Sequence, residues 1–160
     1  MGKLIVVKDD KVEGKDKHNV AGSGQVGNTV SPASWIADFD YKGKMTDALS
    51  DFVNVDGSAA ATIDSKSSLN PGETAPGGGH FAGSGSNFTP PSPTPVPGTL
   101  SITDTIGEGK PSASAGSAFA KIGGAKILLD GDPIDTCDGL GVPMNSTVTA
   151  ENQSFVSCSE

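Results

Sequence analysis

The chain has 160 residues, of which only 34% are hydrophobic, and it contains 22 glycines and 11 prolines. This composition predicts a single domain over residues 1–160, with a small core and much irregular loop. The formal net charge is −8, and all 11 basic residues are lysines. A negative chain without the arginine fork that grips phosphate and guanine is not expected to bind nucleic acid. The apolar run at residues 4–7 is too short for a signal-peptide core or a membrane span.

The first part of the chain predicts short strands and one helix. Residues 4–7 are typical of a strand, whereas residues 8–32 are polar and rich in glycine, which indicates a loop. Residues 35–41 are expected to be extended. Over residues 45–53, apolar side chains recur at i, i+4, i+7 and i+8, the spacing of a buried helical face, so a short helix is predicted. These side chains are Met45, Leu49, Phe52 and Val53.

Further strands are predicted along the rest of the chain. Residues 58–70 alternate weakly, and residues 90–97 (PPSPTPVP) favour a stiff polyproline II segment on the surface. Residues 119–122 and 125–129 are separated by Gly123-Gly124. Two glycines permit the positive φ angles of a tight hairpin turn, so we predict a hairpin here. The apolar residues expected in the core are Trp35, Phe119, Ile122, Ile127, Leu129, Val148 and Val156.

Two motifs resemble known sites but lack the context that those sites require. Residues 22–27, GSGQVG, match G-x-G-x-x-G, yet the sequence after them does not begin the helix that a dinucleotide site needs. We interpret them as a glycine-rich loop. Residues 130–135, DGDPID, bring three carboxylates together, but their spacing is not that of an EF-hand, and a solvated turn is predicted. There is no nucleophile elbow, and the absence of a partnered base argues against an enzyme.

The complete set of histidines and cysteines is small and dispersed. It consists of His18, His80, Cys137 and Cys158. Two imidazoles and two thiolates would satisfy a closed tetrahedral zinc site, although zinc fingers usually pair their ligands locally. Ordinary core and surface roles for the four residues therefore remain open at this point.

The last third of the chain resembles the PAAR and PAAR-like proteins that form the spike tips of contractile injection machines. The resemblance is carried by residues 116–139, GSAFAKIGGAKILLDGDPIDTCDG, and by the terminal STVTAENQSFVSCSE. It rests on the glycine-turned hairpin, the Gly-Asp after it, the following Cys137 and the short final strand. Residues 34–37 and 58–61 echo residues 117–120, but at uneven spacing, so the sequence establishes no repeat.

The resemblance implies a mainly β, compact and cone-like fold, in which short hairpins are arranged with pseudo-threefold symmetry and joined by long Gly/Pro-rich loops. Such a monomer caps the exposed strand edges of a trimeric β-helical spike. In this family a metal held by histidine and cysteine commonly fixes the pointed end. The resemblance therefore favours zinc bound by His18, His80, Cys137 and Cys158, with a Cys137–Cys158 disulfide as the alternative.

The expected function is that of a structural tip that sharpens a trimeric, VgrG-like or phage spike and aids membrane piercing. Cargo effectors are possible further partners, and the membrane is met only mechanically. The resemblance implies assembly into the particle in the cytoplasm of the producing cell, followed by delivery outside it. Two alternatives stay open: a small β-fold effector enzyme, whose acids would be Asp130, Asp132 and Asp135, and a secreted β-rich adhesion module.

Overall fold

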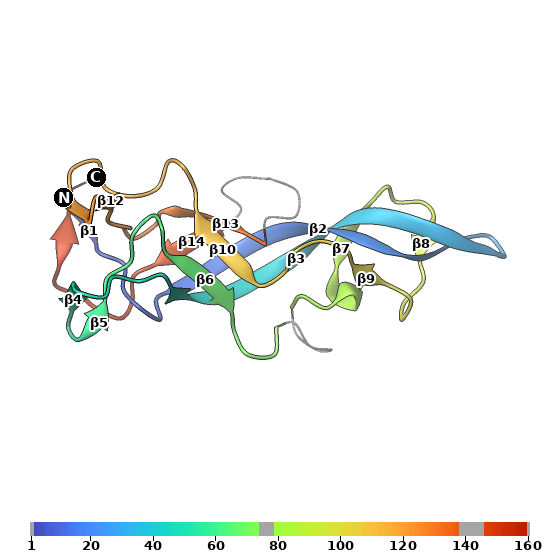
Figure 1. Ribbon diagram of the computed structural model, residues 1–160. Coiled ribbons are helices and arrows are strands. Elements are labelled where there is room, and N and C mark those ends of the chain that lie inside the picture. The colour runs from blue at the N-terminus through green and yellow to red at the C-terminus, as the bar shows by residue number, and fades with distance from the viewer. Residues whose placement is uncertain (1, 74–78, 138–145, 160) are drawn as a thin grey trace.

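The computed structural model describes residues 2–73, 79–137 and 146–159. Over these residues the chain is mainly β and its strands pair antiparallel, as the sequence predicts. The helical element of this part of the chain is a 3-10 turn, η1, at Ala82–Ser84. Within the described ranges, no helix is long and apolar enough to cross a membrane. Figure 1 shows an elongated molecule, with both termini at one end and the turn of a long hairpin at the other.

Six strands of the largest sheet close into a barrel. Their order is β3, β6, β10, β13, β14, β2, and β2 pairs back with β3, so that each strand has two neighbours. The barrel strands are β2 (Lys11–Val26), β3 (Thr29–Asp47), β6 (Lys66–Leu69), β10 (Glu108–Pro111), β13 (Pro133–Thr136) and β14 (Ser146–Thr149).

The other strands lie at the two ends of the barrel. Along the long hairpin, β7 pairs with β3, while β8 and β9 pair with β2. At the opposite end, three pairs of short strands form: β1 with β15, β4 with β5 and β11 with β12. Their bounds are β1 (Lys3–Leu4), β4 (Asn54–Val55), β5 (Ser58–Ala59), β7 (Ser86–Thr89), β8 (Thr94–Pro95), β9 (Ser101–Ile102), β11 (Lys121–Ile122), β12 (Ala125–Lys126) and β15 (Ser157–Cys158).

The long hairpin of β2 and β3 overturns one prediction. The two strands pair without interruption from Lys11 opposite Lys44 to Val26 opposite Thr29. A loop over residues 8–32 is therefore wrong, and the glycine-rich GSGQVG segment forms the end of β2 and its turn. The strand escaped prediction because its inward side chains include polar residues, so that the apolar alternation is incomplete.

The predicted helix over residues 45–53 is also wrong. Met45 lies in β3 and packs into the barrel core, and β3 ends at Asp47. Ala48 then takes a φ of +50°, which a right-handed helix does not allow. Phe52, expected on the buried helical face, is 67% exposed. The helical spacing of the apolar residues was thus a coincidence between a strand end and an irregular segment.

The predicted glycine-turned hairpin is present as β11 and β12, and Gly123 and Gly124 have φ values of +59° and +94°. The strands are shorter than predicted, because Ile127 and Leu129 form bridges with other segments. The segment over residues 58–70 likewise divides into β5 and β6. Both differences have the same cause. At the end of the barrel these segments pair with segments from distant parts of the sequence and not only with their neighbours along the chain.

Most of the predicted core is confirmed. Trp35, Ile122, Ile127, Leu129 and Val148 are buried, and Val156 is partly buried against an apolar cluster. Phe119 is the exception, because its side chain is 79% exposed. Two clusters follow the long axis. The barrel cluster contains Val6, Val12, Tyr41, Met45, Ala61, Ala115, Leu128, Ile134, Cys137 and Val148, and the hairpin cluster contains Val20, Ala37, Phe39 and Ala82.

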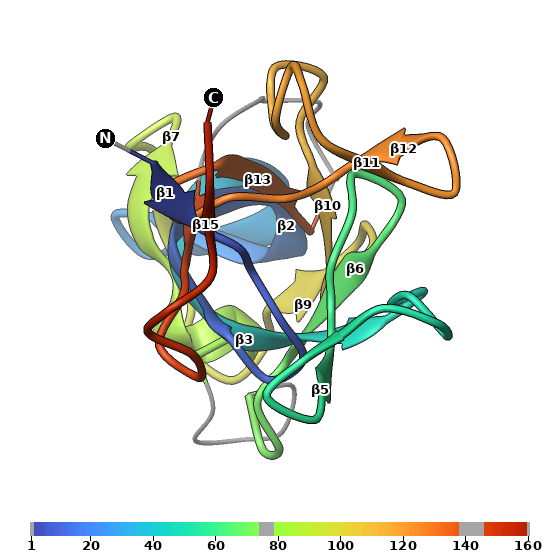
Figure 2. The ribbon, with the colours of Figure 1, turned by 90° about the vertical axis from the view of Figure 1, so that its left-hand side faces the viewer.

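A closed ring of backbone hydrogen bonds lies where the barrel meets the three short strand pairs. The Val6 N–H donates to the Leu128 carbonyl (3.0 Å), the Leu128 N–H to the Ala61 carbonyl (3.0 Å), and the Ala61 N–H to the Val6 carbonyl (2.9 Å). All three residues are fully buried. In the view of Figure 2 the three segments that carry these bonds enclose a triangle. We call this end of the molecule, residues 3–10, 50–65, 117–132 and 153–158, the base.

The hydrogen bonds between side chains and backbone in the segments beside the ring follow one pattern, which occurs three times. Three side chains, Asp10, Ser65 and Asp132, each accept a hydrogen bond from the backbone three residues earlier. Three others, Ser50, Ser117 and Gln153, each accept two from the backbone two and three residues later. Residues 50–65 and 117–132 thus correspond one to one. The third copy joins residues 153–158 to residues 3–10, so the base consists of three equivalent units.

Candidate metal centre

The strand β2 places two polar side chains inside the molecule. Asp16 and His18 are buried, whereas Lys15 and Lys17 beside them are exposed. Because side chains alternate along a strand, Asp16 and His18 point to the same inner side. Asp16 lies opposite Phe39 of β3 in the pairing register.

Two further residues reach this place from distant parts of the chain. His80 lies between β6 and η1, where its N–H donates to the carbonyl of Glu73 (2.8 Å). Cys137 directly follows β13, with a φ of +49° and its N–H bonded to the carbonyl of Glu108 (2.6 Å). The Cys137 Sγ accepts a hydrogen bond from the N–H of Gly107 (3.2 Å). Backbone contacts therefore fix both residues.

The four side chains form one buried cluster. Asp16, His18, His80 and Cys137 each offer one ligand atom, and these atoms lie within 4.8 Å of one another. None of the four residues is more than 1% exposed. The His80 Nε2 lies 3.0 and 3.1 Å from the two oxygens of the Asp16 carboxylate. We call these four residues the buried cluster.

Aromatic rings hold the two imidazoles in place. The ring of His80 stacks on Phe39, with centroids 5.8 Å apart and an interplanar angle of 25°. The ring of His18 meets Phe39 edge-on at 5.3 Å, and His80 meets Tyr41 edge-on at 5.8 Å. Neither imidazole can turn without disturbing these contacts, so the positions of their nitrogens are preorganised.

The electrostatics of the buried cluster centre on Asp16. Burial raises the pKa of this carboxyl, but its polar contacts with His18 and His80 outweigh burial and hold the pKa below its ordinary value. For His18, burial lowers the pKa, and the contacts with the carboxylates of Asp16 and Asp104 reverse that effect, so the net pKa is raised. Burial raises the pKa of the Cys137 thiol strongly, and the charge of Asp16 adds to the increase.

Asp104 supports His18 from outside the cluster. Its Oδ1 lies 2.7 Å from the Nδ1 of His18. Its Oδ2 accepts hydrogen bonds from the backbone N–H and the side-chain amide of Asn19, at 2.7 and 3.0 Å. A carboxylate on one imidazole nitrogen orients the other nitrogen, a support that metal-bound histidines commonly have. Here the other nitrogen, the Nε2 of His18, faces Asp16 at 3.4 Å.

The buried cluster suits a metal cation. The Nε2 of His18 and the Nδ1 of His80 are buried, and neither forms a hydrogen bond within the part of the chain that the structure describes, although the Nε2 of His18 has its 3.4 Å contact with Asp16. Such an arrangement costs free energy unless a ligand is bound. One carboxylate, two imidazoles and one thiolate are ligands that zinc accepts in four-coordinate sites. All four residues are shielded from solvent, which is the property of a structural site and not of a catalytic one with an open position.

Three of the four residues predicted as ligands meet here, and one does not. His18, His80 and Cys137 belong to the buried cluster. Cys158 instead lies in β15, paired with Lys3 of β1, and packs against the apolar side chains of the base. The fourth residue of the buried cluster is Asp16, which the sequence prediction does not include. The alternative of a disulfide is wrong as well, because both cysteines are free thiols.

The sequence prediction omits Asp16 because it draws only on histidine and cysteine ligands and predicts a loop over residues 8–32. The signal was nevertheless present in the sequence. Val12, Asp16, His18 and Val20 stand at even positions of one segment. Read as a strand, this segment places the carboxylate and the imidazole on one face, two residues apart, which is a common geometry for paired ligands.

Two of the three acids named for an enzyme, Asp130 and Asp132, have structural roles. Asp132 is buried, and its Oδ2 accepts hydrogen bonds from the N–H groups of Leu129 (2.7 Å) and Gly116 (2.9 Å). The turn was predicted correctly, but at Asp132 it is not solvated. Asp130 accepts a hydrogen bond from the N–H of Ala150 (2.9 Å). Both carboxylates are therefore engaged in holding the base together.

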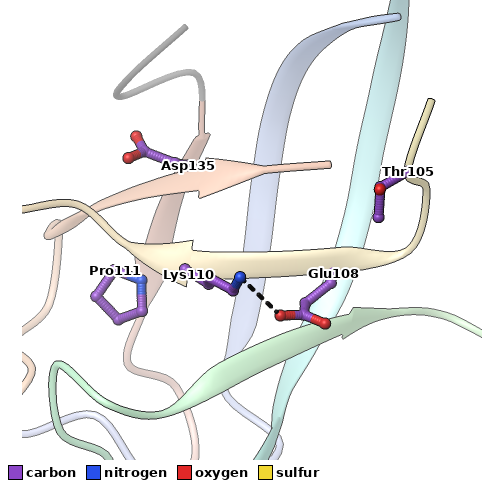
Figure 3. Close-up of a pocket in the computed structure, with 5 residues that line it drawn as sticks. All are labelled: Thr105, Glu108, Lys110, Pro111 and Asp135. Atoms are coloured by element: carbon purple, nitrogen blue, oxygen red, sulfur yellow. Dashed lines mark ion pairs between the residues drawn. The ribbon is translucent and has the colours of Figure 1, made fainter. Parts of the chain in front are cut away.

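A polar groove on the barrel surface is a second candidate site. Thr105, Glu108, Lys110, Pro111 and Asp135 line it, with a volume of about 290 Å³ (Figure 3). Glu108 lies 3.3 Å from the Nζ of Lys110 and 3.0 Å from that of Lys66. Hydrogen bonds from these two lysines lower the pKa of Glu108, which favours a surface ion-pair network over a general acid.

Comparisons with known proteins add no relative. The chain matches no model of a known protein family, no curated protein and no solved structure.

Proposed function

We propose that this protein is a structural tip that caps the end of a homotrimeric β-helical spike in a contractile injection machine. The observation that supports this proposal is the base, in which one chain supplies three equivalent units around a ring of backbone hydrogen bonds. A trimeric β-helix ends in three identical sets of exposed strand edges. A monomer with three equivalent units can meet all three subunits in the same way, which a monomer without such units cannot do.

The shape of the molecule supports the same function. The base is at one end, and the hairpin of β2 and β3 extends away from it to the far end (Figure 1). A cap that presents a broad end to the spike and a narrower end to the target is the arrangement that the resemblance to PAAR-like proteins implies. In this proposal the fold is the cone-like tip of that family, with its first hairpin lengthened.

Zinc is the metal that we propose for the buried cluster. Asp16, His18, His80 and Cys137 would hold it, and its contribution is structural, because binding energy in such a site is also folding energy. The cluster lies between the barrel and the outer part of the long hairpin. A metal there would stiffen the connection between base and tip, and we propose no enzymatic activity.

Binding stoichiometry tests the proposed function. The probe is the purified trimeric β-helix of the spike protein encoded in the same genome, mixed with this protein and analysed by size-exclusion chromatography with light scattering. We expect a complex of one chain per trimer. A complex with three chains per trimer, or free components at micromolar concentration, would refute the proposal.

A further inference from the structure

The base carries three exposed phenylalanines. Phe52, Phe119 and Phe155 have 67%, 79% and 64% of their surface exposed to solvent. The chain contains six phenylalanines, and these are the only ones of the six that are exposed, since Phe39 is buried and the remaining two are partly buried. Leaving large aromatic side chains in water has an unfavourable solvation free energy, which their burial against a partner would recover.

The three phenylalanines occupy the same position in the three units of the base. Each follows by two residues the side chain that accepts two backbone hydrogen bonds, and each donates one of those bonds. The acceptors are Ser50 for Phe52 (3.4 Å), Ser117 for Phe119 (3.2 Å) and Gln153 for Phe155 (3.1 Å). The same residue type therefore recurs three times around the hydrogen-bonded ring, although the neighbouring residues of each differ.

The backbone holds each phenylalanine in place. The residue after each one also donates to the same acceptor, at 3.0 Å from Val53, 3.1 Å from Ala120 and 2.9 Å from Val156. The carbonyl of that following residue then accepts a hydrogen bond from the base segment beside it, at 3.0 to 3.1 Å. Because the backbone is already fixed in this way, binding orders only the two χ angles of each phenylalanine, so these residues are suited to be anchors.

We infer that Phe52, Phe119 and Phe155 are the anchors by which the base docks, each inserting into the same apolar site on one subunit of a homotrimer. The inference rests on the proposed function and assigns its contact residues. The occupant follows from symmetry. Three like anchors around one centre are matched by three identical subunits around a threefold axis, whereas an isologous dimer of this chain would present a twofold contact.

The same surface explains why a single chain suffices for a trimer. The three short strand pairs, β4 with β5, β11 with β12 and β15 with β1, lie around the base (Figure 2). Phe52, Phe119 and Phe155 each precede by two residues the first residue of β4, β11 and β15. Phe52 also lies next to the turn of the following pair, since a Cβ added to Gly123 would be 3.8 Å from its ring, so this phenylalanine sits at a junction between two units.

Single substitutions test the anchors. Phe52→Ser, Phe119→Ser and Phe155→Ser are each titrated by calorimetry against the purified trimeric β-helix of the spike protein from the same genome. We expect each single substitution to raise the dissociation constant about tenfold or more, since buried aromatic anchors dominate interfaces. The triple variant should show no binding. Val26→Ser is the matched control, because Val26 is 60% exposed but lies at the turn of the long hairpin; its binding should equal that of the unmodified protein.

The possible outcomes separate this inference from the proposed function. If the unmodified protein binds the trimer one to three and the three serine variants bind equally well, the anchors are wrong while the capping function stands. If the unmodified protein does not bind the trimer at all, both fail. If it self-associates and the triple variant is monomeric, the face joins copies of this chain, and the inference is overturned. Circular dichroism and thermal melting must show that each variant is folded.

Discussion

The two cysteines provide a matched pair that tests the buried cluster. Cys137→Ser removes a proposed ligand that is fully buried, whereas Cys158→Ser changes a half-buried thiol in β15. We expect the protein with native cysteines, and the Cys158→Ser variant, to bind one zinc ion per chain. Cys137→Ser should lose the ion during dialysis, because a serine hydroxyl is a far weaker zinc ligand than a thiolate.

The magnitude follows from linkage. A ligand that binds only the folded state at 1,000 times its dissociation constant stabilises that state by about 4 kcal/mol. For a domain of this size each kcal/mol shifts the melting temperature by about 2–4 °C. Loss of zinc from Cys137→Ser should therefore lower the melting temperature by about 8–16 °C, and Cys158→Ser should shift it by a few degrees at most. The measurements are elemental analysis and differential scanning calorimetry, each with and without a chelator.

Two results would refute this reasoning. A stoichiometric metal content in Cys137→Ser would show that the thiol is not a ligand. A chelator that leaves the melting temperature of the unmodified protein unchanged would show that no metal contributes to its stability. In that case the buried imidazole nitrogens would have to be satisfied in another way.

Three further predictions follow from the same contacts. Asp104→Asn should weaken zinc binding by about 10–100-fold, measured by competition with a chromophoric chelator, because it disturbs the partner that orients His18; unchanged affinity would show that Asp104 only packs. Leu128→Ala, at the ring of the base, should lower the free energy of unfolding by about 3–5 kcal/mol in urea, against less than about 0.5 kcal/mol for Val26→Ala; similar losses would contradict the ring as the centre of the core. Zinc affinity should rise with pH, because burial raises the pKa of Cys137 and the thiol must lose its proton to bind; a flat profile between pH 6 and about 8 would exclude thiolate ligation.

The fold class could be predicted from the sequence, but the long strand β2 could not. Glycine turns and short apolar runs identify β11, β12 and the final strands directly. In β2, by contrast, the inward positions Asp16 and His18 are polar because they belong to the buried cluster, so the apolar alternation that identifies a half-buried strand is incomplete. The polar residues of the buried cluster thus interrupt the apolar pattern by which β2 would be predicted.

The three units of the base were hidden for a different reason. Aligned by structure, SDFVNV at residues 50–55, SAFAKI at 117–122 and QSFVSC at 153–158 share a phenylalanine and an apolar sixth residue. The third copy continues at the other end of the chain, at residues 3–10, so no fixed period exists in the sequence. The echo that the sequence did suggest, with residues 34–37, falls in β3 and is not part of the base.

The alignment also explains the position of Cys158. It corresponds to Val55 and Ile122 in the other two units, both of which are buried apolar residues, and a free cysteine behaves as a small hydrophobe in such a place. Cys137, in contrast, has its Sγ among polar groups, beside the Gly107 N–H and close to Asp16. The environment of each thiol, which the sequence does not display, separates a packing role from a ligand.

The buried cluster lies where the apolar core is interrupted. Cys137 belongs to the barrel cluster that begins at the hydrogen-bonded ring, and His80 stacks on Phe39 of the hairpin cluster. A chain with 34% hydrophobic residues has too few of them to join both clusters through one continuous core. Four ligands from β2, from the segment before η1 and from the residue after β13 would make that join with a single ion, because coordination bonds replace apolar contacts as the source of folding energy. In this proposal the polar inward side chains of β2 bind the ion and so allow the small barrel to extend into a long, stiff hairpin.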